Sequence, residues 1–368
     1  MTDLKPSMVP RSKSISLTRI CFSALLVMLG LSGRAPASEV SVQAGLAYNS
    51  NPNGLPDSLS GQWTIRSYLS SGVRLFRSSR ALMRLHYQGG IEQRIPEGIT
   101  SYPPEGAITN ALTLSLDYRP LRRAWLGFEA KGKSRNVRHI PGRPGYLNQD
   151  ATLSIDHQPI SQFTSRMYHN RSAKEYHERG TGFRSHATGL VIQRPIWPTL
   201  RASLTLAQSH LRFDRTALRC DASGKVVADS TGTAQRDVLS EAKARLQLTG
   251  RLLLLFEYAF HHNESNSHGY AFRGHKLVLV ATKQLGANVV GQAYASLHWR
   301  HYQDSLMTAP DTYLEEDEYE QRMYIVRISR ALKERLEIQA QYAYRRASSQ
   351  QEKLYHQHLF YVSMGLSH

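Results

Sequence analysis

Apolar and polar residues alternate along most of the 368-residue chain. In residues 39–56, EVSVQAGLAYNSNPNGLP, every second side chain of the first half is apolar, and the alternation ends in asparagine, proline and glycine. Period-two alternation predicts a β-strand with two different faces, and the polar run predicts a turn. The apolar face of this first strand consists of Val40, Val42, Ala44, Leu46 and Tyr48.

The same division into two faces recurs through the chain. In residues 124–135, Leu126 and Phe128 share one face, whereas Lys131 and Lys133 share the other. This pattern predicts a further half-apolar strand. Segments around Tyr87, Ala244, Ala295 and Ala340 divide in the same way.

Connections between the alternating segments fall into two length classes. Tight turns lie near residues 78, 121, 160, 197, 250, 285 and 332, and longer polar connections occupy 49–62, 96–108, 137–149, 174–183, 214–236, 264–270, 304–318 and 347–353. Short turns at one end and long loops at the other are typical of bacterial outer-membrane barrels. We therefore predict an all-β fold, a transmembrane antiparallel up-and-down β-barrel of about 16 strands, within a range of about 14 to 18.

A soluble β-sandwich is the alternative, because its sheets also alternate. Such a sandwich needs a packed core rich in Val, Ile, Leu and Phe, and its turns do not sort into two length classes. In a membrane barrel aromatic residues gather near the interfaces, and many of the 19 tyrosines lie near predicted strand ends. The membrane barrel is favoured, although residues 184–193 and 272–282 leave the register of two strands open.

Residues 1–38 have the layout of a secretory signal peptide. A basic region precedes an apolar run from Cys21 to Gly33, and small residues follow, with cleavage expected after Ala37 or Ser38. The apolar run is too short to span a bilayer. We expect residues 39–368 to form a single barrel domain, with an uncleaved anchor as the alternative for the first segment.

The chain is basic, with 46 Lys and Arg against 29 Asp and Glu and a net charge of +17. In an exported protein this excess suits an anionic surface or an acidic polymer better than nucleic acid. Outside the signal only Cys220 remains, which excludes an internal disulfide framework. We expect no cofactor and no metal.

The polar faces of the predicted strands would line the lumen of a 16-stranded barrel. Basic residues outnumber acidic ones on these faces, and rings of Arg and Lys in a pore favour anions or acidic polymers. Tyr68 and Tyr294 lie on the same faces and are candidates for stacking against sugar rings. The predicted substrate path is Arg66, Tyr68, Arg74, Arg84, Lys131, Lys133, Arg135, Arg166, Arg212, Lys243, Arg245, Tyr294, Arg300 and Arg345.

Each of these basic residues has a structural alternative. Cross-strand ion pairs with the carboxylates predicted on the same faces would stiffen the wall without selecting a substrate. For any single arginine this structural interpretation is favoured, and only the collective excess of charge indicates transport. A register shift of one residue would move a whole face outward. The inward carboxylates are Glu92, Asp117, Glu129, Asp156, Glu241, Glu257 and Glu337.

The histidines do not indicate catalysis, and we predict that the protein is not an enzyme. None of the 16 lies in a nucleophile or metal spacing with a third partner. His356 and His358 share a strand face, where an interface position is favoured over a metal site. The other close pairs are His261 with His262 and His298 with His301.

Both ends of the chain resemble known families. Gly45, Tyr48, Asn49 and Asn51 match the Gly-x-x-Tyr-(Asp/Asn)-x-Asn pattern that opens outer-membrane barrels associated with exopolysaccharide secretion. The barrel of surface lipoprotein assembly modifiers opens in the same way. The last hairpin, with YAYRR at 342–346, is similar to that of the exopolysaccharide-associated barrels. Two features depart from these families: no helical repeat fits between residues 38 and 63, and the chain ends in GLSH without a terminal aromatic residue.

The resemblance implies an outer-membrane channel of a Gram-negative bacterium that exports an exopolysaccharide, and the basic lumen indicates an acidic polymer. The partners expected are this polysaccharide, outer-membrane lipid and a periplasmic polysaccharide-export protein, with no nucleic acid. An anion-preferring diffusion porin is the alternative within transport. A barrel-borne hydrolase and a lipoprotein translocation factor are alternatives from other classes.

Overall fold

The computed structural model describes residues 38–50, 61–95, 106–138, 145–160, 162–177, 182–304, 320–348 and 354–367. Within these ranges no helix is long and apolar enough to cross a membrane. Sixteen strands form one closed barrel and two form a separate hairpin. The strands are β1 (Ser38–Asn49), β2 (Gln62–Arg77), β3 (Ala81–Arg94), β4 (Gly106–Leu121), β5 (Ala124–Arg138), β6 (Tyr146–Ile160), β7 (Phe163–Tyr176), β8 (Gly182–Trp197), β9 (Leu200–Thr216), β10 (Leu218–Cys220), β11 (Val226–Ala228), β12 (Ala234–Leu248), β13 (Leu252–Ser265), β14 (Phe272–Gly286), β15 (Val289–Tyr302), β16 (Glu320–Lys333), β17 (Leu336–Ser348) and β18 (Leu354–Ser367).

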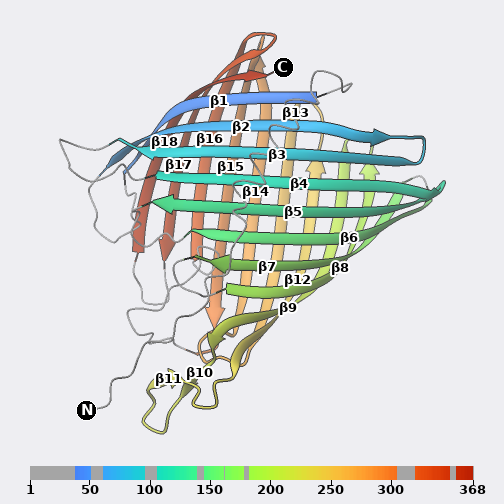
Figure 1. Cartoon of the computed structure of the whole chain (residues 1–368). Coiled ribbons are helices and arrows are strands. Elements are labelled where there is room, and N and C mark those ends of the chain that lie inside the picture. Colours follow the sequence, from blue (N-terminus) through green and yellow to red (C-terminus); the bar gives the residue numbers. More distant parts are fainter. Residues whose placement is uncertain are drawn as a thin grey trace, which may run out of the picture.

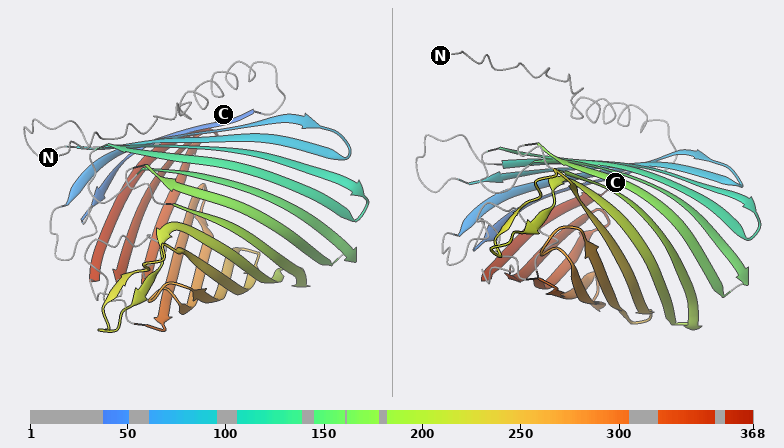
Figure 2. Two further views of the ribbon diagram at one scale, coloured as in Figure 1. Left: turned by 60° about the horizontal axis from the view of Figure 1, so that its bottom comes forward. Right: turned by 90° about the horizontal axis from the view of Figure 1, so that it is seen from below.

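Each barrel strand pairs antiparallel with the barrel strands before and after it in the chain. The pairing of β9 with β12 passes over the hairpin of β10 and β11, and the pairing of β1 with β18 closes the ring. Figure 1 shows β1–β9 crossing in front of β13–β18, as expected for two tilted walls of one barrel, and Figure 2 shows the curvature of these walls. The predicted fold and the predicted number of strands are confirmed.

The outer face of the wall is apolar and exposed. Register aligns Leu46 with Ile65 on one neighbouring strand and with Val362 on the other. These three side chains keep 42%, 49% and 56% of their surface exposed. Large apolar side chains in this position suit contact with lipid, and a closed ring pairs the backbone groups of each strand with its neighbours. The sheet is therefore a transmembrane barrel.

Aromatic and histidine side chains share this outer face. The hydroxyl of Tyr344 lies 2.7 Å from Nδ1 of His356. Tyr342 makes the same contact with His358, at 2.9 Å. Aromatic residues with one polar end favour the boundary between hydrocarbon and water. The two histidines therefore occupy outward positions among tyrosines, as the sequence analysis favoured.

The register also settles the two strands whose faces the sequence left open. On β8 and β14 the apolar outward residues are confined to the half near the short turns, and basic or histidine residues continue the same face toward the long connections. Because only part of such a strand crosses hydrocarbon, the outward face becomes polar beyond it. The outward residues of β8 are Arg184, His186, Thr188, Leu190, Ile192 and Arg194, and those of β14 include Arg273, His275, Leu277 and Leu279.

The hairpin of β10 and β11 lies within the long connection between β9 and β12, which the sequence analysis read only as a loop. Asp229 holds it together: its carboxylate accepts a hydrogen bond of 2.7 Å from the Thr231 hydroxyl and lies 3.1 Å from the Arg219 guanidinium. Its side chain is almost fully buried. The Thr231 hydroxyl, followed by the Thr231 backbone N–H, lowers the pKa of Asp229.

A lowered carboxyl pKa favours the folded hairpin above the ordinary value of about 4, and this contribution is lost as the pH falls through the folded-state pKa. We expect backbone amides of β10 and β11 to be protected from hydrogen exchange at neutral pH and to lose protection on acidification. Asp229→Asn should already lack this protection at neutral pH. Asp214→Asn, near the end of β9 and outside the hairpin, is the control, and equal protection in Asp229→Asn and wild type would contradict this role.

Because the outer face of the barrel contacts lipid and the inner face does not, an arginine introduced at two adjacent positions on β9 should affect stability differently. Leu206 faces outward and Ala207 faces inward, opposite Glu241 in the register. Leu206→Arg is expected to destabilise the barrel by about 2–4 kcal/mol near the bilayer midplane and less near an interface. Ala207→Arg should change stability little. Urea unfolding in lipid vesicles, followed by the electrophoretic mobility of the folded form, measures both, and similar losses would contradict the assignment of faces.

Candidate functional site: the inner wall of the barrel

The register places the predicted lumen residues on the inner face, with one exception. Each of them alternates with the outward apolar residues of its own strand, except where a register shift brings Phe76 on β2 and Val290 on β15 into the same parity as the inward residues. Their placement as wall residues follows from the pairing, whereas their role in a substrate path stays a prediction. The inward set is Arg66, Tyr68, Arg74, Arg84, Lys131, Lys133, Arg135, Arg166, Lys243, Arg245, Tyr294, Arg300 and Arg345.

Arg212 is the exception, because it points outward. It pairs with Arg184 on β8 and with Arg236 on β12, and it has the parity of the outward Leu206. The alternation of apolar outside and polar inside applies only to the roughly 9–11 residues of a strand that cross hydrocarbon. β9 has 17 residues, so Arg212 lies on the part that extends toward the long connections. The prediction of a lumen position was wrong.

Five of the predicted lumen cations are held by carboxylates on the same face. Arg166 grips Asp156 through two bonds, of 2.5 Å from Nε and 2.9 Å from Nη2. Cross-strand pairs of this kind stiffen the wall and neutralise its charge. The structural interpretation therefore applies to them. The other cross-strand pairs are Arg66 with Glu92 at 3.3 Å, Arg84 with Asp117 at 2.7 Å and Arg245 with Glu257 at 2.5 Å. Lys243 pairs within its own strand, at 3.2 Å from Glu241 two residues away on β12.

A second group of cations keeps its charge uncompensated. Lys131, Lys133 and Arg135 follow one another at alternate positions on the inner face of β5. Among the described residues none of the three forms an ion pair. Their register partners on β4 are the neutral Thr113, Ala111 and Thr109, and those on β6 are Asp150, Asn148 and Tyr146. We call these residues the β5 triad. It forms a column of positive charge along the direction of the strand.

Aromatic rings lie beside this column, toward the long connections. The ammonium of Lys133 lies 5.6 Å from the centre of the Tyr146 ring, and that of Lys174 lies 5.1 Å from the same ring. Lys174 also lies 4.9 Å from the Tyr176 ring. Such distances allow cation–π attraction. The inner ends of β5–β7 thus alternate cations with aromatic faces.

The alternation continues on the other side of the mouth. The Arg215 guanidinium lies 4.8 Å from the Phe213 ring and 4.5 Å from the Tyr270 ring. Arg300 lies 4.5 Å from the Phe272 ring. Together with the residues near β5–β7 these form an inward band at the level where the long connections begin. The mouth band consists of Lys133, Tyr146, Lys174, Tyr176, Phe183, Phe213, Arg215, Tyr270, Phe272, Arg300 and Tyr302.

The aromatic members of the mouth band were missed in the sequence, where tyrosines near strand ends suggested outward girdles. The inward position can be read from the spacing along each strand, because residues an even number apart share a face. Tyr146 lies four residues from the inward Asp150 and therefore shares its face, whereas Phe213 lies seven residues from the outward Leu206 and therefore faces inward. The two aromatic residues that were predicted lie deeper. Tyr68 packs over the backbone of β3, since a Cβ at Gly90 would lie 3.0 Å from its ring.

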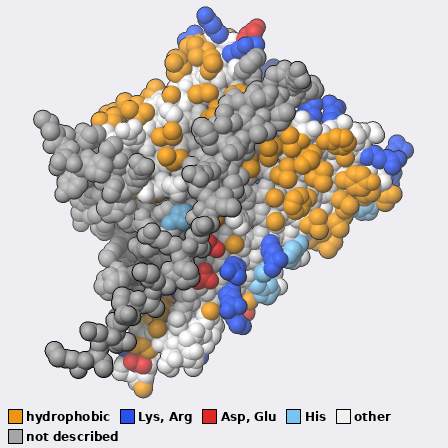
Figure 3. Space-filling view, viewed as in Figure 1, with side chains coloured by type: hydrophobic (Ala, Val, Ile, Leu, Met, Phe, Trp, Pro, Cys, Tyr) orange, Lys and Arg blue, Asp and Glu red, His pale blue; other side chains and the backbone are white. Residues whose placement is uncertain are grey.

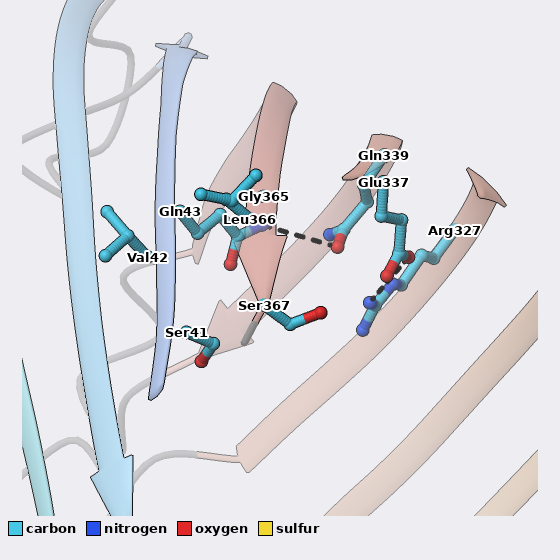
Figure 4. A pocket seen from close by; sticks show the side chains of 9 residues that line it. All are labelled: Ser41, Val42, Gln43, Arg327, Glu337, Gln339, Gly365, Leu366 and Ser367. Carbon is cyan, nitrogen blue, oxygen red and sulfur yellow. Dashed lines mark hydrogen bonds and ion pairs between the residues drawn. The ribbon is translucent and has the colours of Figure 1, made fainter. Parts of the chain in front are cut away.

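Two recesses interrupt the inner wall. A shallow one of 650 Å³ lies over β3–β8 and contains the Arg84 and Arg166 ion pairs together with Tyr168. A smaller one of 170 Å³ lies at the seam between β1 and β18, where Gln43 donates to Gln339 over 3.5 Å and Arg327 lies 3.8 Å from Glu337 (Figure 4). Both are open rather than enclosed pockets. Within the described ranges no group of three or more His, Cys, Asp or Glu side chains is arranged to hold a metal.

No family model and no curated protein sequence matches this chain. Among solved structures, it is similar to Pseudomonas aeruginosa OccK8 (OprE), with a TM-score of 0.47, 9% identity, and coverage of 90% of this chain and 97% of that one. It is also similar to a bacterial polysaccharide outer membrane secretin, with a TM-score of 0.43, 9% identity, and coverage of 89% of this chain and 97% of that one. For Pseudomonas aeruginosa OpdK with vanillate the TM-score is 0.46 and the identity 10%, with coverage of 91% of this chain and 100% of that one.

Paired and unpaired cations are expected to respond differently to charge reversal. Arg166→Glu would place two carboxylates side by side and is expected to destabilise the barrel by about 1–2 kcal/mol. Arg135→Glu, whose register partners are Thr109 and Tyr146, should change stability by less than about 0.5 kcal/mol. Both substitutions change the lumen charge equally. Urea unfolding distinguishes them, and equal destabilisation would contradict the division into structural and uncompensated cations.

Proposed function

We propose that this barrel is an outer-membrane export channel of a Gram-negative bacterium for an acidic exopolysaccharide. The observation that carries the proposal is the mouth band, in which cations and aromatic rings alternate along the inner wall between β5 and β15, with the β5 triad continuing below it. An acidic sugar chain offers carboxylates to the cations and the flat faces of its rings to the aromatic residues.

The arrangement suits a polymer better than a tightly held small molecule. The triad residues recur at every second position, which is about 7 Å along a strand. A column of this kind offers successive equivalent sites, and passage requires binding that is weak and repeated. The recesses of the wall are open, so they favour sliding contact over capture. We propose that a periplasmic export protein brings the polymer across the periplasm to the barrel.

An anion-preferring diffusion porin is the second candidate, because the same uncompensated triad would attract small anions. The two functions differ in their use of the mouth band. A porin needs positive charge in the lumen but no aromatic faces, whereas a polysaccharide channel uses both. Substitutions in the aromatic members of the band therefore separate the candidates.

Deletion of the gene is expected to abolish surface polysaccharide, and the wild-type gene should restore it. A triple variant with Lys131→Glu, Lys133→Glu and Arg135→Glu should fail to restore it, because the column of positive charge becomes negative. The matched control, Lys131→Arg, Lys133→Arg and Arg135→Lys, keeps the charge and should restore export. Quantification of acidic polysaccharide at the cell surface measures all four strains, and unchanged polysaccharide in the deletion strain would refute export.

Planar bilayers test the contribution of the aromatic rings. Acidic oligosaccharides added on the side of the long connections are expected to interrupt the current, and neutral oligosaccharides of equal length much less. Tyr146→Ala with Phe272→Ala should shorten the interruptions by about 30-fold, since stacking contributes on the order of 1 kcal/mol per ring. Steady anion-selective current without interruption by either sugar would favour the porin.

A further inference from the structure

Three arginines stand side by side on the outer surface of the barrel. Arg212 of β9 is the direct register partner of Arg184 on β8 and of Arg236 on β12. All three side chains are exposed. Directly opposed residues on neighbouring strands have Cβ atoms only about 5 Å apart, so like charges there repel one another. We call this set the arginine row.

The next level of the same face, two residues closer to the short turns, is also basic or histidine-containing. Arg171 on β7 pairs with His186 on β8, which pairs with His210 on β9. All three are exposed. In the space-filling view, Lys, Arg and His side chains gather over β7–β9, next to the hydrophobic surface of the preceding strands (Figure 3).

In the part of the chain that the structure describes, no carboxylate forms an ion pair with the arginine row. Glu175, Asp214 and Glu264 lie on the same face at its edges, but among the described residues none of them forms an ion pair with these arginines. Glu264 lies 3.4 Å from His262 instead. An anion bound between these guanidinium groups would reduce their mutual repulsion, and an anion with more than one acceptor oxygen could accept hydrogen bonds from several of them.

The row lies on the same outward face as the lipid-facing band, with two polar outward positions between the row and the band on each strand. On β9 the outward Leu206 is six residues, or about 20 Å along the strand, from Arg212. On β8 the outward Leu190 stands at the same distance from Arg184, and it is the register partner of Leu206. Strand tilt reduces the height between the two levels. Apolar surface for acyl chains and arginines for a charged headgroup thus follow one another on the same strands.

We propose that the arginine row binds the phosphate groups of a phosphorylated glycolipid in the outer leaflet of the membrane. The guanidinium groups of Arg184, Arg212 and Arg236 donate hydrogen bonds to phosphate oxygens, for which their forked geometry is suited. The acyl chains of the same lipid lie against Leu190 and Leu206 below. A soluble acidic polymer or protein would use the charge of the row but not the apolar band further along the same strands, which is why a lipid is the occupant that fits. This site is on the outer wall and does not depend on the proposed export function.

The test compares two triple variants that remove the same number of charges. Arg184→Gln, Arg212→Gln and Arg236→Gln alters the outer row, and Lys131→Gln, Lys133→Gln and Arg135→Gln alters the inner wall. Binding of purified lipopolysaccharide to each protein in detergent micelles is measured by native mass spectrometry, after the folded form has been verified by electrophoretic mobility. At about 1 kcal/mol per arginine, the outer variant should bind on the order of 100-fold more weakly. The inner variant should bind as the wild type does.

Two further probes identify the group that is recognised. Lipopolysaccharide from which the lipid phosphates have been removed should bind the wild type as weakly as the intact lipid binds the outer variant. Inorganic phosphate at concentrations comparable to the protein should not displace the intact lipid, because it makes no contact with the apolar band. Equal lipid binding by the outer variant and the wild type would overturn the proposal, as would an equal loss in both variants or displacement by phosphate alone.

Discussion

The structure depends on one constraint: backbone N–H and C=O groups inside hydrocarbon need hydrogen-bond partners within the protein. An open sheet would leave two edges unpaired, and the pairing of β1 with β18 removes them. This contact joins residues some 300 positions apart, and on the inner face the 2.6 Å bond from Gln43 to Ser363 spans the same seam. Closure creates the enclosed inner face on which the candidate site lies.

Closure also separates two chemistries that alternate along every strand. Outward residues meet lipid and inward residues meet one another, so part of the charge on the inner wall is neutralised by ion pairs between inward residues, as in Arg166 with Asp156 and Arg245 with Glu257. Cations that remain uncompensated, such as the β5 triad, are then available to a solute. Where the strands extend beyond hydrocarbon the rule no longer applies. At that level the mouth band places aromatic rings inside, and the arginine row places charge outside.

The sequence predicted the strands, the two classes of connection and the inward side of β5, because period-two alternation is a local property that a few residues reveal. It failed for Arg212, where parity was taken from nearby polarity rather than from the continuous register through Leu206. It also missed the inward position of Tyr146, since an aromatic residue near a strand end suits a girdle as well as a lumen. The hairpin of β10 and β11 was missed because it is held by side-chain contacts of Asp229.

By itself, the sequence determined which segments become strands, where they turn and which side chains share a face, since these follow from the pleat of a single strand. Which cations are paired was decided only by the tertiary structure. Lys131 and Arg166 look alike in the sequence, and the register places an aspartate opposite each of them. Only Arg166 forms an ion pair, with Asp156, whereas Asp150, opposite Lys131, accepts a hydrogen bond from Asn148. Cross-strand distance, which no single strand contains, therefore decides the chemistry of both faces.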